Sequence, residues 1–174
     1  MPEWEAIVRR HSERVWQITR RVLGNEADAA DCFQDVFAEA IRTIDERQAE
    51  TIENWEAFLC RLATCRAVDV LRRRYRTAER RQTYDVAELP AKNPPAGDLE
   101  LEELRCRLRA ALAQLPANQA QAFAARELDQ CSYEETAERL AISVSHARVL
   151  LHRARASLRT LLADLGPDQI LNDE

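Results

Sequence analysis

Residues 131–159, CSYEETAERLAISVSHARVLLHRARASLR, restrict the fold of this chain more than any other segment. Ser132 followed by Glu135 forms a capping box, which starts a helix because each side chain satisfies a backbone N–H group of the other residue. Ala141-Ile142 then makes a tight turn, and Ser143 can cap a second helix. The pattern predicts two short helices joined by a turn, with a second helix that is rich in arginine and free of acids.

The second of these helices has one apolar face and one polar face. Its apolar side chains recur at spacings of three and four residues and form one buried stripe: Val144, Ala147, Leu151, Ala154 and Leu158. The outward set consists of Ser145, His146, Arg148, Val149, His152 and Arg153. A helix-turn-helix whose second helix presents such a face can enter the major groove of DNA.

The composition favours helices along the whole chain. The 174 residues include only 3 glycines and are rich in Ala, Leu, Arg and Glu, which gives little support for strands. No apolar run approaches the length of a membrane-spanning helix. The first residues carry acids where a secretion signal would need a basic stretch and an apolar core. We therefore expect an all-α, cytoplasmic protein without membrane insertion.

The five cysteines do not form a metal-binding or redox motif. No C-x-x-C pair occurs among them, and the three histidines show no zinc-like spacing with them. We interpret them as small buried hydrophobic side chains, with a metal site as the minor alternative, and expect no cofactor. They are Cys32, Cys60, Cys65, Cys106 and Cys131.

The net charge of −5 hides an uneven distribution. Residues 60–82 carry eight arginines against two acids, and residues 142–162 carry four arginines and no acid. Between them, residues 83–104 carry six acids against one lysine. Two basic patches on an acidic chain suit local phosphate contacts better than long-range attraction to DNA. Such a protein would bind DNA weakly unless a partner brought it there.

Three helices are expected in the first half of the chain. Gly24-Asn25 is a stop signal between the first two, and the third begins apolar and ends strongly basic. The expected helices cover about residues 3–23, 26–44 and 54–81, with a loop at 45–53. The side chains expected to face inward are Ile7, Val8, His11, Val15, Ile18 and Val22 in the first helix, and Ala30, Phe33, Val36, Phe37, Ala40 and Ile41 in the second.

Residues 83–98 differ from the rest of the chain in composition. They contain three of the six prolines and one of the three glycines, which predicts a flexible acidic linker. Helical patterns resume over about residues 99–114 and 116–128. The predicted organisation is therefore two small helical domains, at residues 1–82 and 99–174, joined by this linker.

Both predicted domains resemble parts of one protein family, in the order in which the family has them. ADAADCFQDVFAEAIR and WEAFLCRLATCRAVDVLRRRYR look like region 2 of bacterial sigma factors. ALAQLPANQAQAFAARELDQCSYEETAERLAISVSHARVLLHRAR looks like region 4. The resemblance covers roughly residues 5–82 and 105–162. The chain is too short to hold a region 3 domain or an N-terminal inhibitory region as well, which points to the extracytoplasmic-function (ECF) class.

The resemblance implies a function and its partners. A sigma factor binds core RNA polymerase through the clamp helices and the flap, recognises the −10 and −35 promoter elements, and helps to melt the DNA. An anti-sigma factor is a further candidate partner. By position, the clamp helices would contact Gln34, Asp35, Phe37 and Ala38. In the alternative interpretation Phe33 and Phe37 are only packing residues; we place Phe33 in the hydrophobic core and leave Phe37 open.

The resemblance also implies that the basic end of the third helix holds the −10 element as a separated strand. Proteins hold single strands in basic grooves with stacking platforms, and can flip a base into a pocket. The loop at 45–53 would capture the base, while Trp55 and Phe58 belong to the hydrophobic core. The alternative is a solvated arginine face without a ligand. The expected contacts are Arg66, Arg72, Arg73, Arg74 and Arg76.

In region 4, the outward face of the second helix would recognise the −35 element. The family often has a run like T-V-K-S-R where this chain has HARVL at residues 146–150, so Leu150 replaces an arginine. Losing one arginine contact costs about 1–3 kcal/mol of binding free energy. Val149 could instead meet a thymine methyl group. Ala141 stands where the family turn often has glycine, at a cost of up to about 1 kcal/mol if a positive φ is required.

Two other functions stay open, and neither is enzymatic. No Gly-rich phosphate loop, carboxylate pair or nucleophile constellation appears, so we expect no catalytic activity. A sigma-like decoy that binds an anti-sigma factor without engaging DNA would suit the acidic net charge and Leu150, but it has no use for the basic cluster at 72–76. A dimeric helix-turn-helix repressor would need a dimerisation element and a ligand pocket, and the sequence shows neither.

Overall fold

In the computed structural model, which describes residues 3–46, 52–81 and 99–163, every described element is a helix. None of these helices is long and apolar enough to span a membrane. The all-α prediction is confirmed, while the predicted linker and most of the 45–53 loop lie outside the described residues. The elements are α1 (Trp4–Leu23), α2 (Glu26–Glu46), α3 (Trp55–Arg81), α4 (Leu99–Gln114), α5 (Ala117–Phe123), the π-helix η1 (Ala124–Leu128), α6 (Tyr133–Leu140) and α7 (Val144–Leu161).

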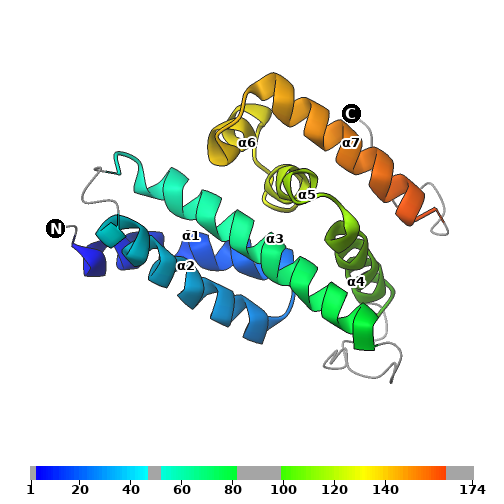
Figure 1. Ribbon diagram of the computed structural model, residues 1–174, viewed down its shortest axis with the longest axis horizontal. Coiled ribbons are helices and arrows are strands. Elements are labelled where there is room, and N and C mark those ends of the chain that lie inside the picture. Colours follow the sequence, from blue (N-terminus) through cyan, green and yellow to red (C-terminus); the bar gives the residue numbers. More distant parts are fainter. Residues whose placement is uncertain (1–2, 47–51, 82–98, 164–174) are drawn as a thin grey trace.

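The long helix α3 lies in the middle of the molecule. It packs against α1 and α2 of the first half, and against α4, α5 and α6 of the second half, while α7 packs on α4, α5 and α6 (Figure 1). One continuous cluster of buried hydrophobic side chains runs through both halves and includes Leu71 of α3, Leu112 of α4 and Leu151 of α7. The two halves therefore share a hydrophobic core.

Gly24 ends α1 as the sequence predicts. It adopts the left-handed conformation with φ 68°, and its N–H donates to the carbonyl of Arg20 at 2.8 Å. The guanidinium of Arg109, from α4, fills the space where a Cβ atom of residue 24 would lie. A cation is favourable there because the C-terminal end of a helix carries partial negative charge. Gly24 thus both ends α1 and lets α4 approach.

The inward faces of the first two helices differ in how closely they follow the prediction. In α1, Val15, Ile18 and Val22 are buried as expected, and the other three predicted positions are half-buried: Ile7, Val8 and His11. In α2 the buried face is rotated from the predicted one.

Phe37 of α2 is buried at 7% exposure, whereas Phe33 is half-buried and packs edge-on against it with ring centroids 5.1 Å apart. Ile41, which was expected inside, is 38% exposed. Phe37 therefore belongs to the hydrophobic core, which is the packing role that the sequence had left open for it, and little of its ring is exposed to a partner. Ile41 takes a surface position instead.

A buried carboxylate connects the two halves. Asp129 follows η1, and its side chain is only 2% exposed. Its oxygens accept hydrogen bonds from Arg14 and Arg21 of α1 and from Arg139 of α6, at 2.5 to 3.1 Å. We call these four residues the Asp129 cluster. It joins α1 to the segments that carry the helix-turn-helix.

The backbone before α6 is less regular than the sequence suggests. The helix that follows Pro116 widens into the π-helix η1, where the N–H of Asp129 donates to the carbonyl of Ala124 at 3.0 Å. Gln130 then takes a left-handed conformation with φ 56°. Short π-helical turns of this kind often serve functional positions. Here the irregular turn presents the side chain of Asp129 to α1.

The cysteines behave as packing residues. All five are free thiols; Cys32, Cys60 and Cys131 are buried, and Cys65 and Cys106 are half-buried. Among the described residues, no group of three or more His, Cys, Asp or Glu side chains could hold a metal ion. Burial raises the pKa of the Cys32 thiol from its usual 9.0 to about 12.

Replacing Asp129 with asparagine keeps the size of the side chain but removes the counter-charge of Arg139, which is only 8% exposed. We expect the free energy of unfolding to fall by about 3–5 kcal/mol. Urea denaturation followed by circular dichroism measures it. Asp31→Asn, at an exposed position of α2, is the control and should change stability by less than about 0.5 kcal/mol. Equal unfolding midpoints for D129N and wild type would show that the Asp129 cluster does not stabilise the fold.

Cys32 should resist alkylation in the folded protein, because the reactive thiolate forms only near a pH of about 12. With iodoacetamide at about pH 8, we expect mass spectrometry to find Cys32 labelled only as fast as the protein unfolds. The unfolded chain loses this proton near pH 9.0 and the folded chain keeps it, so the contribution of Cys32 to stability should fall between pH 9.0 and about 12. Native-state labelling as fast as in urea would contradict this.

Candidate nucleic-acid interface

The predicted helix-turn-helix is formed by α6 and α7. The hydroxyl of Ser132 accepts a hydrogen bond from the N–H of Glu135 at 3.0 Å, and the carboxylate of Glu135 accepts one from the N–H of Ser132 at 2.7 Å. Ser143 caps α7 by accepting from the N–H of His146 at 3.2 Å. Both predicted caps are confirmed, and they fix where the two helices begin.

Ala141 occupies the turn between these helices with φ 54°, in the left-handed region. This is the conformation that glycine adopts without strain, so alanine here costs up to about 1 kcal/mol. The position does require a positive φ, as the resemblance to the family suggested. The helix-turn-helix is formed in spite of this cost, because the caps and the buried stripe of α7 outweigh it.

The outward face of α7 agrees with the sequence analysis. All six predicted side chains are exposed: Ser145, His146, Arg148, Val149, His152 and Arg153. The buried stripe consists of Ala147, Leu151, Ala154 and Leu158, with Val144 half-buried. Arg155 donates to Glu127 of η1 at 2.6 Å and so holds α7 to the rest of the second half.

Leu150 corrects one expectation of the sequence analysis. It is only 3% exposed, so it belongs to the hydrophobic core together with Leu151. An arginine at this position would have to bury its charge in an apolar environment. In this fold Leu150 therefore packs in the core and is not part of the outward face of α7.

The arginines of α3 that were predicted to hold the −10 element fall into two groups. Arg66 forms an ion pair with Glu39 of α2, and Arg74 forms one with Asp28 of α2 at 2.5 Å. The hydrogen bond to Glu39 raises the pKa of the Arg66 guanidinium above its usual value. These two arginines hold α2 against α3, and carboxylates within the fold match their charges.

The second group consists of Arg72, Arg73 and Arg76. Arg73 and Arg76 are exposed, and Arg72 is half-buried with an Nε atom that has no hydrogen-bond partner. No ion pair of these three is found within the described residues. Within the described residues, no carboxylate matches these three positive charges of α3. At the opposite end of α3, Trp55 and Phe58 pack against the hydrophobic core, as predicted.

A second exposed surface lies on α2. Gln34, Asp35 and Ala38 are exposed, as a docking surface requires. Ile41 lies three residues after Ala38 and therefore on the same side of the helix. Ile41 was expected on the buried face of α2, although its spacing from Gln34 and Ala38 is helical.

Tyr133 lies beside the outward face of α7. Its ring is half-buried at the first position of α6. The guanidinium carbon of Arg148 lies 5.1 Å from the ring centroid, and that of Arg126 lies 5.2 Å from it. Both distances are within the range of cation–π interactions. The ring therefore contacts one residue of the predicted −35 face and one residue of η1.

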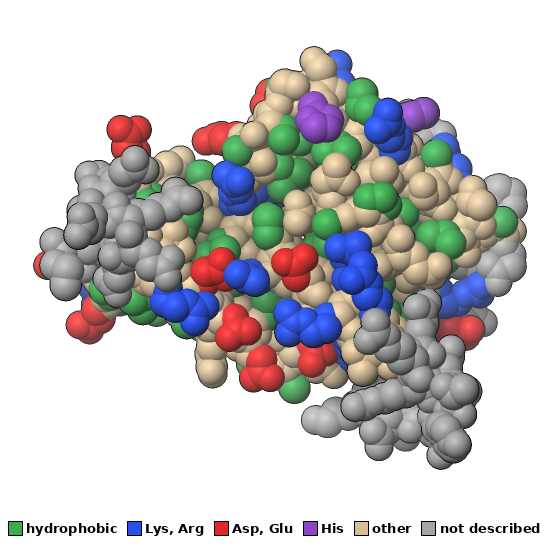
Figure 2. Space-filling model, in the orientation of Figure 1, with side chains coloured by type: hydrophobic (Ala, Val, Ile, Leu, Met, Phe, Trp, Pro, Cys, Tyr) green, Lys and Arg blue, Asp and Glu red, His purple; other side chains and the backbone are tan. Residues whose placement is uncertain are grey.

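The charges differ between the two parts of the visible surface. Figure 2 shows acidic and basic side chains alternating over α2 and α3, whereas basic and histidine side chains lie over α7. The sequence of α7 contains no acid. A surface with cations and no carboxylates suits the DNA backbone, because each phosphate carries a negative charge.

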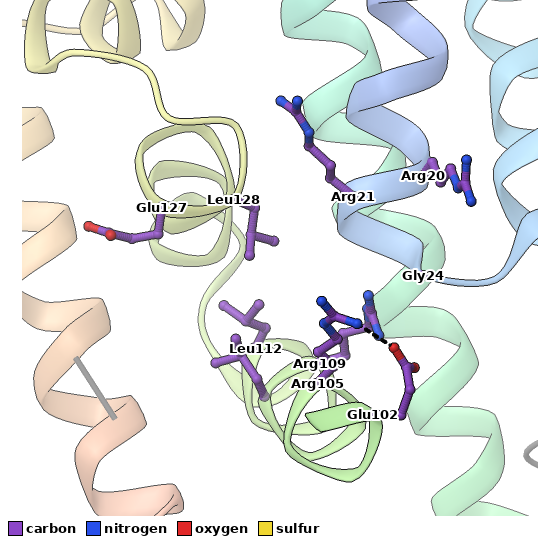
Figure 3. Close-up of a pocket in the computed structure, with 10 residues that line it drawn as sticks. Arg20, Arg21, Gly24, Glu102, Arg105, Arg109, Leu112, Glu127 and Leu128 are labelled. Atoms are coloured by element: carbon purple, nitrogen blue, oxygen red, sulfur yellow. Dashed lines mark hydrogen bonds and ion pairs between the residues drawn. The ribbon is translucent and has the colours of Figure 1, made fainter. Parts of the chain in front are cut away.

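A cavity of about 500 Å³ lies where the C-terminal end of α1 meets α4 and η1 (Figure 3). Leucines and arginines line it, but the guanidinium groups do not converge on one point. Arg20 and Arg21 extend in different directions, and Arg105 pairs with Glu102 at 2.7 Å (Figure 3). We interpret this cavity as part of the boundary between the two halves.

Known protein families match both halves of the chain. The model for Sigma-70 region 2 matches residues 7–77, and that for Sigma-70, region 4 matches residues 107–158. The chain is 34% identical over 164 residues to the ECF RNA polymerase sigma factor SigE of Mycolicibacterium smegmatis, covering 94% of this chain and 63% of SigE. It is 30% identical over 137 residues to the ferric citrate uptake sigma factor FecI of Escherichia coli K12, covering 77% and 76% of the two chains.

A solved structure supports the fold. The sigma factor RpoE of Bartonella quintana, in complex with the anti-sigma factor NepR, superposes with a TM-score of 0.55 and 19% identity, over 95% of this chain and 100% of RpoE. The matched regions follow the same order as in the family, and together they cover most of the chain. The chain therefore belongs to the sigma-70 family of RNA polymerase sigma factors, in its ECF group.

Proposed function

We propose that this protein is a cytoplasmic sigma factor that directs core RNA polymerase to promoters with −10 and −35 elements. The observation that carries the proposal is that the chain exposes two separate basic surfaces, one in each family region. The first consists of Arg72, Arg73 and Arg76 at the end of α3, and the second is the outward face of α7. A protein that recognises two promoter elements needs two such surfaces, and it needs no catalytic residues of its own.

The two surfaces suit different forms of DNA. The face of α7 fits the major groove of a duplex, where Arg148 can donate to base edges or phosphates and Val149 can contact a thymine methyl group. The arginines at the end of α3 suit a separated strand, which is held by its phosphates while bases stack or flip out. We therefore assign the −35 element to α7 and the opened −10 element to α3. The predicted domains at 1–82 and 99–174, with the linker at 83–98, belong to the same proposal.

The surface of α2 is assigned to the polymerase. Gln34, Asp35, Ala38 and Ile41 form one exposed strip, and the apolar Ile41 gives this strip a group that gains from burial against a partner. The clamp helices would dock there, and region 4 would contact the flap. Because RpoE is solved with an anti-sigma factor, we include a protein of this class among the partners of the present chain.

The decoy alternative loses one of its two supports. Leu150 had suggested a missing DNA contact, but the buried position of this residue explains it as packing. The remaining support is the acidic net charge of the whole chain. It does not apply to α7, which contains no acid, or to the end of α3, which is rich in arginine. Run-off transcription with purified core polymerase on a genomic promoter library separates the possibilities. We expect discrete transcripts that depend on this chain; a decoy would yield none, and a repressor would reduce transcription from other holoenzymes.

Asp35→Lys should weaken binding to core polymerase, because Asp35 is exposed on the proposed docking strip and the substitution reverses its charge. We expect the dissociation constant, measured by fluorescence anisotropy with labelled protein, to rise by about tenfold. Glu13→Lys makes a similar charge change at an exposed position of α1 and should bind normally. If D35K bound core polymerase as tightly as wild type, α2 would not be the docking surface.

Arg148→Ala and the double variant Arg73→Ala/Arg76→Ala should fail at different steps. R148A should lose about 1–3 kcal/mol of −35 binding free energy, yet open normally a template that is already mismatched at −10. The double variant should bind the duplex but fail to open a matched promoter, because α3 no longer holds the separated strand. Permanganate footprinting of thymines near −10, on matched and pre-melted templates, measures both. Equal failure of R148A on both templates would refute this division of labour.

A further inference from the structure

The compact arrangement of the two halves does not fit the spacing of the two proposed promoter elements. Elements centred near −10 and −35 lie about 25 base pairs apart, which is about 85 Å of duplex at about 3.4 Å per base pair. A compact chain of 174 residues has a diameter of about 40 Å. A duplex of that length is too stiff to fold back over such a distance. The end of α3 and the face of α7 therefore cannot reach both elements while α4 packs against both helices.

The Asp129 cluster is a charged contact across the boundary between the halves. Arg14 and Arg21 come from α1 of the first half, whereas Asp129 belongs to the second half, as does Arg139. The side chain of Arg139 is 8% exposed, but those of Arg14 and Arg21 are 34% and 45% exposed. When the halves part, Asp129 keeps Arg139 as its counter-charge, and the two arginines of α1 move fully into water. The contact can therefore break without leaving a buried charge unpaired.

Packing is loose on both sides of this cluster. The cavity of about 500 Å³ in Figure 3 is lined in part by Arg21, and a second cavity of about 180 Å³ is lined in part by Arg14 and Arg139. Protein interiors leave few voids larger than a water molecule. Opening the boundary here therefore costs fewer apolar contacts than parting a fully packed interface would, and the arginine bridges to Asp129 provide a large part of the resistance.

We propose that the Asp129 cluster is an intramolecular latch, which keeps the free chain in a closed form that cannot engage both promoter elements. Arg14 and Arg21 hold α1 to Asp129 until the polymerase draws the two halves apart. The inhibition is one of reach, because the docking strip on α2 and the outward face of α7 are both exposed in the closed form. This inhibitory role rests on the proposed function, whereas the control of opening by the two bridges does not.

Three buried thiols can report on opening. Cys60 of α3 and Cys131, which precedes α6, line the smaller cavity from opposite sides of the boundary. Burial raises the pKa of both thiols, so they react slowly while the halves are together. Cys32 is buried in α2, which packs against α1 and α3 of the first half. Its labelling therefore reports on unfolding of the first half and not on parting of the halves.

Arg14→Ala/Arg21→Ala should open the boundary in the free, full-length chain. With iodoacetamide at about pH 8, we expect mass spectrometry to find Cys60 and Cys131 labelled about tenfold faster than in wild type, because both bridges are charge-assisted hydrogen bonds. The labelling of Cys32 should not change. Equal labelling rates in wild type and R14A/R21A would overturn the latch. An equal rise at Cys32 would overturn it as well, because it would show a general loss of stability.

Two further variants control for charge and for stability. Arg9→Ala/Arg10→Ala removes the same charge from exposed positions of α1 and should be labelled like wild type. A rise in this variant equal to that in R14A/R21A would show an effect of net charge and refute the latch. Arg21→Ala alone removes the more exposed bridge, so it should keep the urea midpoint near that of wild type and still speed the labelling at the boundary. No rise in this folded variant would count against the latch.

Binding to core polymerase tests the inhibitory role. Because the polymerase selects the open form, the dissociation constant of R14A/R21A should fall by about the factor by which labelling rises. Binding to a duplex that carries only a −35 element should not change, and tighter binding there would overturn inhibition by reach. An unchanged dissociation constant for polymerase would overturn it too. If wild type and variants all fail to bind polymerase while the labelling rises as expected, the proposed function fails and the latch stands.

Discussion

The buried carboxylate of Asp129 is the interaction on which the arrangement of this molecule depends. A carboxylate with 2% exposure is costly unless several donors surround it, and here three arginines do. Burial alone would lower the pKa of Arg139, but its hydrogen bond to Asp129 helps to raise that pKa above the usual value. Because Arg14 and Arg21 come from α1, the carboxylate fixes α1, the end of η1 and the start of the helix-turn-helix relative to one another.

Arginine has two distinct uses in this chain. Arg66 and Arg74 pair with carboxylates of α2, and Arg155 pairs with Glu127, so these side chains fasten helices together. Others, such as Arg73 and Arg148, have no such partner among the described residues and face solvent. The net charge of −5 is therefore a poor guide to binding. What matters is which arginines have their charge matched inside the fold, and that can be known only from the packing.

Local patterns were sufficient to predict most of the helices. The spacings of three and four residues in α7 identified its buried stripe, and Ser132 with Glu135 identified the start of α6. Both predictions worked because each signal is formed by residues that are close together in the sequence. Periodicity was less successful at the edges of an apolar face. In α2, Ile41 was placed on the buried face although it is exposed, and Phe37 was left open although it is buried. The reason is that a helix with many apolar residues can bury more than one face.

Other features could not be predicted from the sequence. The contact between Arg14 and Asp129 spans 115 positions, and no local pattern indicates it. The spacing of Arg14 and Arg21, two helical turns apart on one side of α1, was the only available hint. Leu150 was misjudged for a different reason: comparison with the family's usual run of residues suggested that leucine here loses an arginine contact to DNA, although it sits next to Leu151 of the buried stripe. Position in a motif does not show whether a side chain is exposed.

The chemistry of the α7 face suggests that affinity and specificity have different sources in this protein. Val149 is 45% exposed, and His146 and Ser145 lie beside it, so the part of the face that can reach base edges is apolar or weakly polar. Such groups discriminate bases through a thymine methyl group or single hydrogen bonds, and they add little electrostatic attraction. The attraction must then come from arginines that contact phosphates, which position a protein on DNA without selecting a sequence. Arg148 and Arg153, which are exposed on α7, would supply such attraction and leave the choice of promoter to the neutral side chains of this helix.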